Sequence, residues 1–186
     1  MITDNGKKAM LITMLYSSGS SNNIFLVPVK VTAGYTAYLS NACSSSNMFP
    51  RNIYDSVNFP STNTNGLGIL IGSGTTPASS SDYNMESVFK NDSHLSSSNL
   101  VIAFDYSVPN KYAKIFTFTV TNGGTDSVTV GELGYVQSMN IGTQGSTATN
   151  SNYLLLDHTL LDTPVTIPAG ESATITYRME IDLTNL

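Results

Sequence analysis

The stretch ATITYRMEI, residues 173–181, alternates apolar and polar residues without interruption. Successive side chains of a β-strand point to opposite faces of the sheet, so this pattern predicts a strand with one buried face. The positions expected to face inward are Ala173, Ile175, Tyr177, Met179 and Ile181, and those expected to face outward are Thr174, Thr176, Arg178 and Glu180.

The same alternation occurs twice upstream, in LVIAFDYSV (100–108) and in KIFTFTV (114–120). Each stretch is therefore predicted to be a strand with one buried face. The expected inward positions are Leu100, Ile102, Phe104, Tyr106 and Val108 in the first stretch, and Phe116, Phe118 and Val120 in the second.

Two later stretches break the simple alternation. In VTVGELGYV (128–136) the apolar positions change parity at Gly131, which predicts a β-bulge, because one extra residue turns every later side chain to the other face. The turn formers of NGGTDS (122–127) precede it and predict a hairpin connection. YLLLDHTLL (153–161) is apolar on both faces, which predicts a strand covered on both sides or an interface strand. PVTI (164–167) then forms a short strand before the tight turn Pro168-Ala169-Gly170.

The first half of the chain has weaker signals. Residues 1–16 favour a short helix capped by Thr3 or Asp4, with an N-terminal strand as the alternative, and 17–23 form a polar linker. IFLVPVKV (24–31) predicts a strand that Pro28 confines to an edge or a bulge. GLGILIG (66–72) predicts a short buried strand, and the Ser- and Asn-rich segments predict long loops.

Short strands with turn signals between them predict an all-β fold, an antiparallel β-sandwich of the immunoglobulin-like or jelly-roll-like type. We expect one domain with three parts. Residues 1–23 are the N-terminal segment and linker, 24–99 are the loop-rich part of the sandwich, and 100–186 are its regular core.

Composition excludes several classes of function. The net charge is −5 and the Lys and Arg residues are scattered, so nucleic-acid binding is not expected. The single cysteine, Cys43, leaves no intrachain disulfide. The apolar run AMLITMLY (9–16) is too short for a membrane span, and without an A-x-A site after it no signal peptide is expected.

No pattern of residues predicts catalysis, a cofactor or a metal. The glycines of GSGTT (72–76) lack the third glycine of a dinucleotide site and the lysine of a P-loop. Asp157 and His158 are strand neighbours on opposite faces, so they cannot form a Ser-His-Asp relay, and His158 is expected at an interface or on the surface. Asp82, Glu86 and Asn84 are oxygen donors, but they lack the spacing of a calcium loop.

Contacts between subunits are the remaining role for the polar residues of these loops. The candidate positions for a subunit interface are Gly72, Gly74, Thr75, Asp82, Tyr83, Glu86 and His158.

Five segments, taken together, resemble a known group of proteins. They are MITDNGKKAMLITML, GILIGSGTTPASSSDYNMES, KIFTFTVTNGG, VTVGELGYV and LLLDHTLLDTPVTIPAGESATITYRMEI. This order is similar to that of small structural proteins of tailed bacteriophages and prophages. The likeness covers both ends and the second half of the chain but not residues 20–65, and His158 stands where the group has a basic residue.

The resemblance implies a non-enzymatic virion protein of the decoration, head-fibre, collar or tail type. Such a protein would assemble in the host bacterial cytoplasm, as a homo-oligomer and with other virion proteins, without binding nucleic acid or inserting into a membrane. The alternative function is a module that binds a glycan on the host surface, because the ten tyrosines suit sugar contacts as well as protein contacts.

Overall fold

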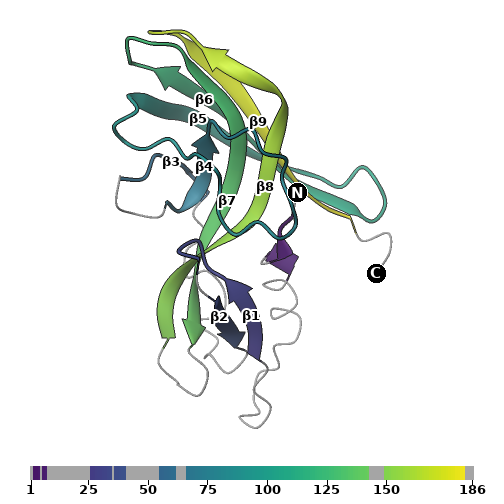
Figure 1. Cartoon of the computed structure of the whole chain (residues 1–186). Helices are drawn as coiled ribbons and strands as arrows, with labels where there is room; N and C mark the ends of the chain where they lie inside the picture. Colours follow the sequence, from purple (N-terminus) through teal and green to yellow (C-terminus); the bar gives the residue numbers. More distant parts are fainter. Residues whose placement is uncertain are drawn as a thin grey trace.

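The structure is a computed structural model, and it describes residues 2–4, 6–7, 26–34, 36–40, 55–61, 66–142 and 149–182. Strands dominate these ranges, so the prediction of an all-β fold is confirmed (Figure 1). The strands are β1 (Leu26–Lys30), β2 (Thr36–Ser40), β3 (Val57–Asn58), β4 (Gly68–Gly72), β5 (Leu95–Asp105), β6 (Lys111–Asn122), β7 (Val128–Gly142), β8 (Thr149–Ile167) and β9 (Ser172–Asp182).

The strands form two sheets that pack as a sandwich. The larger sheet has the order β1-β2-β7-β4-β3, with β8 paired to β7, and the smaller sheet has the order β5-β6-β9. All pairs are antiparallel except the short parallel pair of β3 and β4. The long strands β7 and β8 extend from the sandwich down to β1 and β2 (Figure 1). β1 lies at the edge of its sheet, as Pro28 predicts.

The hydrophobic core lies between the two sheets. Phe116, Phe118 and Tyr177 are almost fully buried, so the inward faces predicted for 114–120 and for the first part of 173–181 are confirmed, whereas Met179 and Ile181 are only partly buried. The larger sheet contributes Leu133 and Tyr135 from β7, and Ile69 and Ile71 from β4. The core therefore draws on strands from both sides of residue 100, and the division into 24–99 and 100–186 stays a prediction.

The connections β4–β5, β6–β7 and β8–β9 each pass from one sheet to the other. The prediction that NGGTDS joins a hairpin is wrong, because β6 and β7 lie in different sheets. Asn122, fully buried, holds this crossing to the one between β8 and β9. Its Nδ2 donates to the carbonyl oxygens of Asp126 at 2.8 Å and Ile167 at 3.0 Å, and its Oδ1 accepts the N–H of Gly124 at 2.9 Å.

The irregularities of β7 and β8 are partly as predicted. The pairing register shifts between Val130 and Glu132, which confirms the bulge at Gly131. The two strands predicted in 153–167 are one strand, β8, whose pairing with β7 is interrupted around residues 161–164. Leu154 and Leu155 are both fully buried, so the prediction that this strand is covered on both sides is confirmed.

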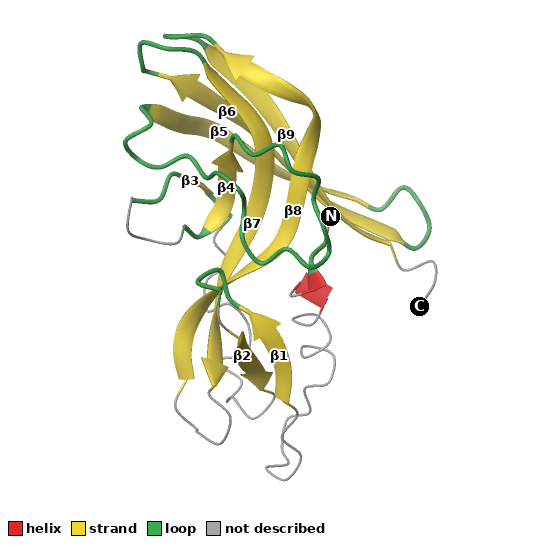
Figure 2. Ribbon diagram, viewed as in Figure 1, coloured by secondary structure: helices red, strands yellow, loops and turns green. Residues whose placement is uncertain are grey.

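The N-terminus begins with one helical turn, red in Figure 2. Thr3 caps it, because its Oγ1 accepts the N–H of Gly6 at 3.1 Å while the N–H of Lys7 donates to the Thr3 carbonyl oxygen at 3.0 Å. Thr3 Oγ1 also donates to the carbonyl oxygen of Leu155 at 2.6 Å, which attaches the turn to β8. The rest of the predicted helix and the linker lie outside the described residues.

The burial predicted for 100–108 is wrong. Phe104 is 59% exposed and Tyr106 is 64% exposed. β5 and β6 continue past the end of the opposing sheet, so the strand has the predicted alternation but no second layer over this part (Figure 2).

We expect Phe118→Ala to lower the free energy of unfolding by about 3–5 kcal/mol, because it leaves a cavity in the core. Thr117→Ala, at the half-buried neighbouring position on the other face, should cost far less. Urea denaturation of the two variants beside the unchanged protein measures both values. Equal losses would contradict the assignment of the two faces of β6.

Candidate functional site

Most of the residues predicted as interface positions come together around Glu132, under the loop 73–87. This loop leaves β4 and returns beside it, and its base is closed where the Ser73 N–H donates to the Ser87 carbonyl oxygen at 2.8 Å. Met85, from the loop, packs with Leu70 and Leu155. The loop thus covers the face of the larger sheet that points away from the sandwich core.

The carboxylate of Glu132 is the centre of the site. Its side chain is 1% exposed. Oε1 accepts the backbone N–H groups of Ser87 at 2.6 Å and Gly74 at 3.3 Å, and Oε2 accepts that of Glu86 at 3.1 Å. His158 Nε2 lies 3.0 Å from Oε2. One N–H group of GSGTT, that of Gly74, therefore does bind an anion, but the anion is a side chain of the same protein and its other backbone donors are Glu86 and Ser87.

The bulge at Gly131 places Glu132 there. Val130 faces the sandwich core, and regular alternation would direct Glu132 to the same side. The extra residue turns Leu133 inward instead and directs Glu132 toward the loop. A carboxylate among apolar side chains would be costly without partners, so the bulge moves the charge to where donors exist.

The two glycines of the G-x-G pattern allow the carboxylate to approach the backbone. Gly72 pairs directly with Glu132 across the β4–β7 ladder. A Cβ atom at Gly74 would lie 2.5 Å from Glu132 Cδ, and one at Gly72 would lie 2.8 Å from Glu132 Cγ. These glycines are needed for close packing, which is a role that their spacing alone does not reveal.

His158 links two carboxylates across the same face. Its Nδ1 lies 2.6 Å from Asp82 Oδ2, and its Nε2 lies 3.0 Å from Glu132 Oε2. Both acceptors are carboxylates, so both ring nitrogens donate and the imidazole is held as the cation. Burial alone would lower the pKa of His158, but the hydrogen bonds to Glu132 and Asp82 outweigh burial and raise it.

The pKa of Glu132 moves in the opposite direction. Burial alone would raise it, but the hydrogen bonds from His158 and from the N–H groups of Ser87 and Glu86 lower it. His158 and Glu132 therefore form a buried ion pair. The expectation that His158 lies at an interface or on the surface is wrong, because the residue is 4% exposed.

The network does not resemble a catalytic relay. A His that donates from both nitrogens has no lone pair with which to accept a proton from a nucleophile. Asp157 turns to the other face, as predicted, where Tyr177 Oη donates to its Oδ1 at 2.5 Å. In the described ranges, no group of three or more His, Cys, Asp and Glu residues is arranged to hold a metal ion.

The other predicted residues also make contacts within the chain. Glu86 Oε2 accepts the N–H groups of Thr75 at 2.8 Å and Thr76 at 2.9 Å, and these two bonds lower the pKa of Glu86. The ammonium of Lys30 lies 3.7 Å from the centre of the Tyr83 ring.

Burial separates the predicted interface residues into two groups. Gly72, Gly74 and His158 are buried within the chain, so they pack internally. Exposed surface remains on the other four, for which a subunit contact stays a prediction: Thr75, Asp82, Tyr83 and Glu86. Glu132 was identified only by the structure, because its one sequence signal is its place beside the change of parity.

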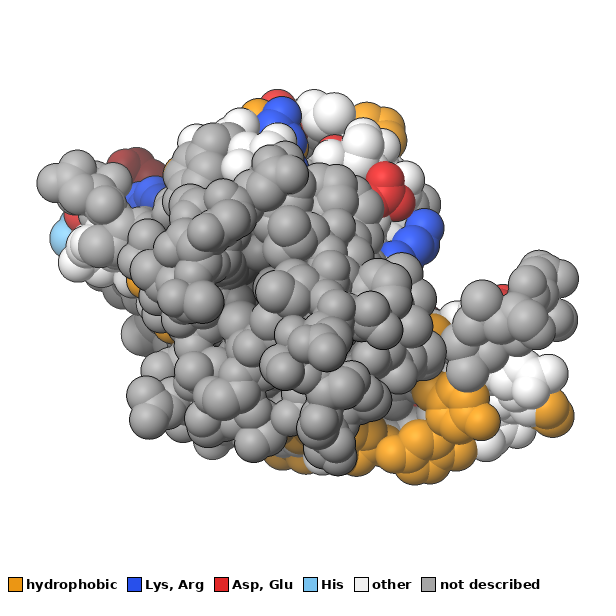
Figure 3. All heavy atoms as spheres, turned by 90° about the horizontal axis from the view of Figure 1, so that it is seen from below, with side chains coloured by type: hydrophobic (Ala, Val, Ile, Leu, Met, Phe, Trp, Pro, Cys, Tyr) orange, Lys and Arg blue, Asp and Glu red, His pale blue; other side chains and the backbone are white. Residues whose placement is uncertain are grey.

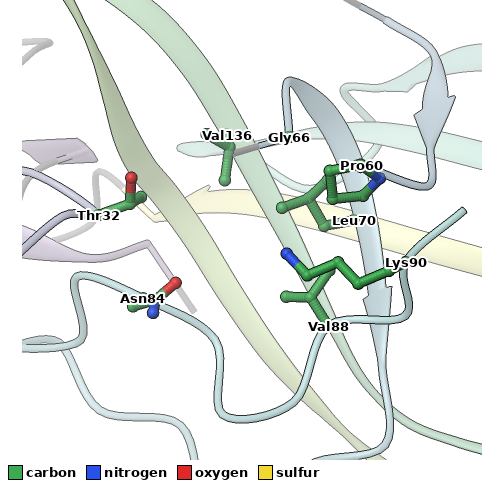
Figure 4. Close-up of a pocket in the computed structure, with 8 residues that line it drawn as sticks. All are labelled: Thr32, Pro60, Gly66, Leu70, Asn84, Val88, Lys90 and Val136. Atoms are coloured by element: carbon green, nitrogen blue, oxygen red, sulfur yellow. The ribbon is translucent and has the colours of Figure 1, made fainter. Parts of the chain in front are cut away.

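A small hollow lies between the loop and the larger sheet (Figure 4). Its volume of about 260 Å³ includes open solvent, and it is below the roughly 300–1,000 Å³ of small-molecule sites. The amine of Lys90 extends into it beside Leu70 and Val88 (Figure 4). The residues that line it include no carboxylate, His or Cys to act as a partner for the amine.

Within the described ranges, the exposed large apolar side chains lie at one end of the smaller sheet, on and between β5 and β6. We call this part, residues 101–113 and 178–182, the overhang (Figure 2). In antiparallel pairs, directly opposite residues point to the same face. Ile102 is opposite the buried Phe116, and Phe104 is opposite Lys114, so both point to the core side of the sheet.

The layer that covers the smaller sheet ends opposite Lys114 of β6. The Lys114 ammonium binds both carboxylate oxygens of Asp55, at 2.7 and 2.6 Å, and Tyr135 donates to Asp55 Oδ1 at 2.8 Å. Beyond this pair the rings of Phe104, Tyr106 and Tyr112 contact one another, with centroids 6.2 and 5.9 Å apart. We call Ile102 and these three residues the aromatic face. Hydrophobic side chains gather on the side from which the overhang projects (Figure 3).

Comparison with protein-family models, with curated proteins and with solved structures found no match to this chain. Within the described part of the chain, no helix has the length and hydropathy required to cross a membrane. The function must therefore be argued from the site itself.

We expect the buried ion pair to make stability depend on pH. A His whose pKa is raised on folding stabilises the folded state below its unfolded pKa of about 6.5, and this contribution is lost as pH rises through the folded pKa. The difference in unfolding free energy between the unchanged protein and His158→Gln should therefore shrink as pH rises above about 6.5. The exposed His94, changed to Gln, is the control and should leave the profile unaltered. A constant difference for His158→Gln would contradict the charged pair.

We expect Gly74→Ala to destabilise the protein by about 1–3 kcal/mol, because the added methyl group meets the Glu132 carboxylate. Ser73→Ala is the control, because it changes the adjacent exposed residue and removes only one exposed hydrogen bond, to Ser87 Oγ. Thermal and urea unfolding of both variants measure the difference. A Gly74→Ala protein as stable as Ser73→Ala would show that the carboxylate does not need this space.

Proposed function

We propose that this chain is a non-enzymatic structural component of a tailed-phage virion. It would assemble in the host bacterial cytoplasm, by binding copies of itself and neighbouring capsid, neck or tail proteins. The observation that supports this proposal is the aromatic face, a continuous apolar surface on a projecting part of the fold. Large exposed apolar patches on soluble proteins mark contact sites. The sequence resemblance to phage structural proteins supplies the setting.

The polar residues support the same proposal. The Glu132–His158–Asp82 network uses its charges to attach the loop 73–87 to the larger sheet. Side chains that bind one another in this way hold the loop in one position on the sheet. The network therefore favours a rigid body that presents a surface to other proteins.

Purified particles provide the test. We expect the chain to migrate with virions through a density gradient, and a gold-labelled antibody to mark one repeated position on each particle. Particles from cells that lack the gene are the control. A chain absent from gradient-purified particles would contradict the proposed function.

The alternative is a module that binds a host-surface glycan. The exposed rings of Tyr106 and Tyr112 favour it, because tyrosines can stack on sugars and also donate hydrogen bonds. This alternative expects the isolated chain to bind cells or a glycan array, and Tyr106→Ala to abolish that binding. If no glycan and no cell is bound, this alternative is removed and the structural proposal is unaffected.

A further inference from the structure

The overhang is half of a sandwich. Along the smaller sheet, Phe116 and Tyr177 are covered by the larger sheet and are at most 1% exposed. On β6, the covering by the larger sheet ends at Lys114, two residues before Phe116. Tyr112, two residues before Lys114, is 45% exposed. Tyr112 pairs with Ile181 on β9, so the uncovered surface spans all three strands. An apolar sheet face is stable when a second layer buries it.

The two faces of the overhang differ in charge. The outer face carries the ion pairs Arg178–Asp105 at 2.8 Å and Lys111–Asp182 at 3.0 Å. Hydrogen bonds from Ser107 and Arg178 hold the pKa of Asp105 at about 2. Among the described residues, the aromatic face carries no ionisable group except tyrosine, and Lys114 at its border is paired with Asp55. A surface without charge meets an identical surface without like-charge repulsion.

The exposed area is close to what a pair of copies needs. Ile102, Phe104, Tyr106 and Tyr112 are 37%, 59%, 64% and 45% exposed. Because large side chains present about 150–250 Å² each, these four residues expose roughly 400 Å² per chain. Val108, which is 46% exposed, and the partly buried Ile181 add to this surface. Two copies can thus bury roughly 1,000 Å², which is about the least that a specific interface needs and is below the 1,200–2,000 Å² of standard interfaces.

We propose that the partner of the aromatic face is the same face of a second copy of this chain. The two overhangs pack face to face about a twofold axis, so each supplies the layer that the other lacks. The contact is isologous, and its centre consists of Phe104, Tyr106 and Tyr112 from both chains. This inference rests on the proposed assembly function and names the partner and the surface.

The mass of the full chain in solution tests the inference. By light scattering after size exclusion, we expect twice the 19.9 kDa of a single chain. Phe104→Asp and Tyr112→Asp, on neighbouring strands of the aromatic face, should each weaken the dimer by at least about 30-fold. Val101→Asp is the matched control, because Val101 is 61% exposed, nearly as much as Phe104, but lies opposite Thr117 and points to the outer face. It should change the dimer affinity by less than about twofold. Circular dichroism verifies that each variant is folded.

Three outcomes would overturn the inference. A single-chain mass at the highest concentration that the protein tolerates means that another partner, a virion protein or a glycan, covers the face. An oligomer unaffected by Phe104→Asp and Tyr112→Asp means that the contact lies elsewhere. Equal disruption by Phe104→Asp and Val101→Asp means that β5 pairs edge to edge, so that both faces are affected. The proposed function is tested separately, by the presence of the chain in purified particles, and none of these three outcomes changes that result.

Discussion

The burial of one carboxylate, Glu132, constrains the loop and both long strands of the larger sheet. A buried carboxylate is tolerated only when donors surround it, and its donors come from three places: the return of the loop at residues 86 and 87, the glycine at 74, and His158 on β8. Satisfying this one charge therefore fixes the loop over the sheet. The outer face of β8 is then covered, which is why Leu155 can be as fully buried as a core residue.

The resulting body has three layers of unequal length. The loop 73–87 and the larger sheet cover each other, and the smaller sheet covers the other side, but its strands continue beyond Lys114 without an opposing layer. Charges occupy the outer face of that extension, and aromatic rings occupy the inner face. A rigid body with one uncovered apolar face suits a protein that acts by contact with other chains.

The sequence predicts those features that depend on neighbours along the chain. The inward faces of 114–120 and 173–181 follow from the period of a strand, and the bulge at Gly131 follows from a change of parity. The hairpin expected at 122–127 fails, because turn formers reverse the chain without determining whether the next strand joins the same sheet. Of the site, residue types identify Gly72, Gly74, Asp82 and His158, and Glu132 is missed because its partners lie far away in the sequence.

The positions of β6 and β9, their alternation and the position of the bulge were thus determined by the sequence alone, because each depends on local backbone geometry. Only the tertiary structure decided which inward faces are buried and which charges meet. Phe104 and Phe116 have the same parity signal, yet one is 59% exposed and the other is fully buried. The difference arises because burial depends on how far the opposing sheet extends, and that sheet is built from strands remote in the sequence. Likewise, Gly74 of the G-x-G pattern and Ser87 at the other end of the loop bind the same carboxylate only because the fold places Glu132 between them.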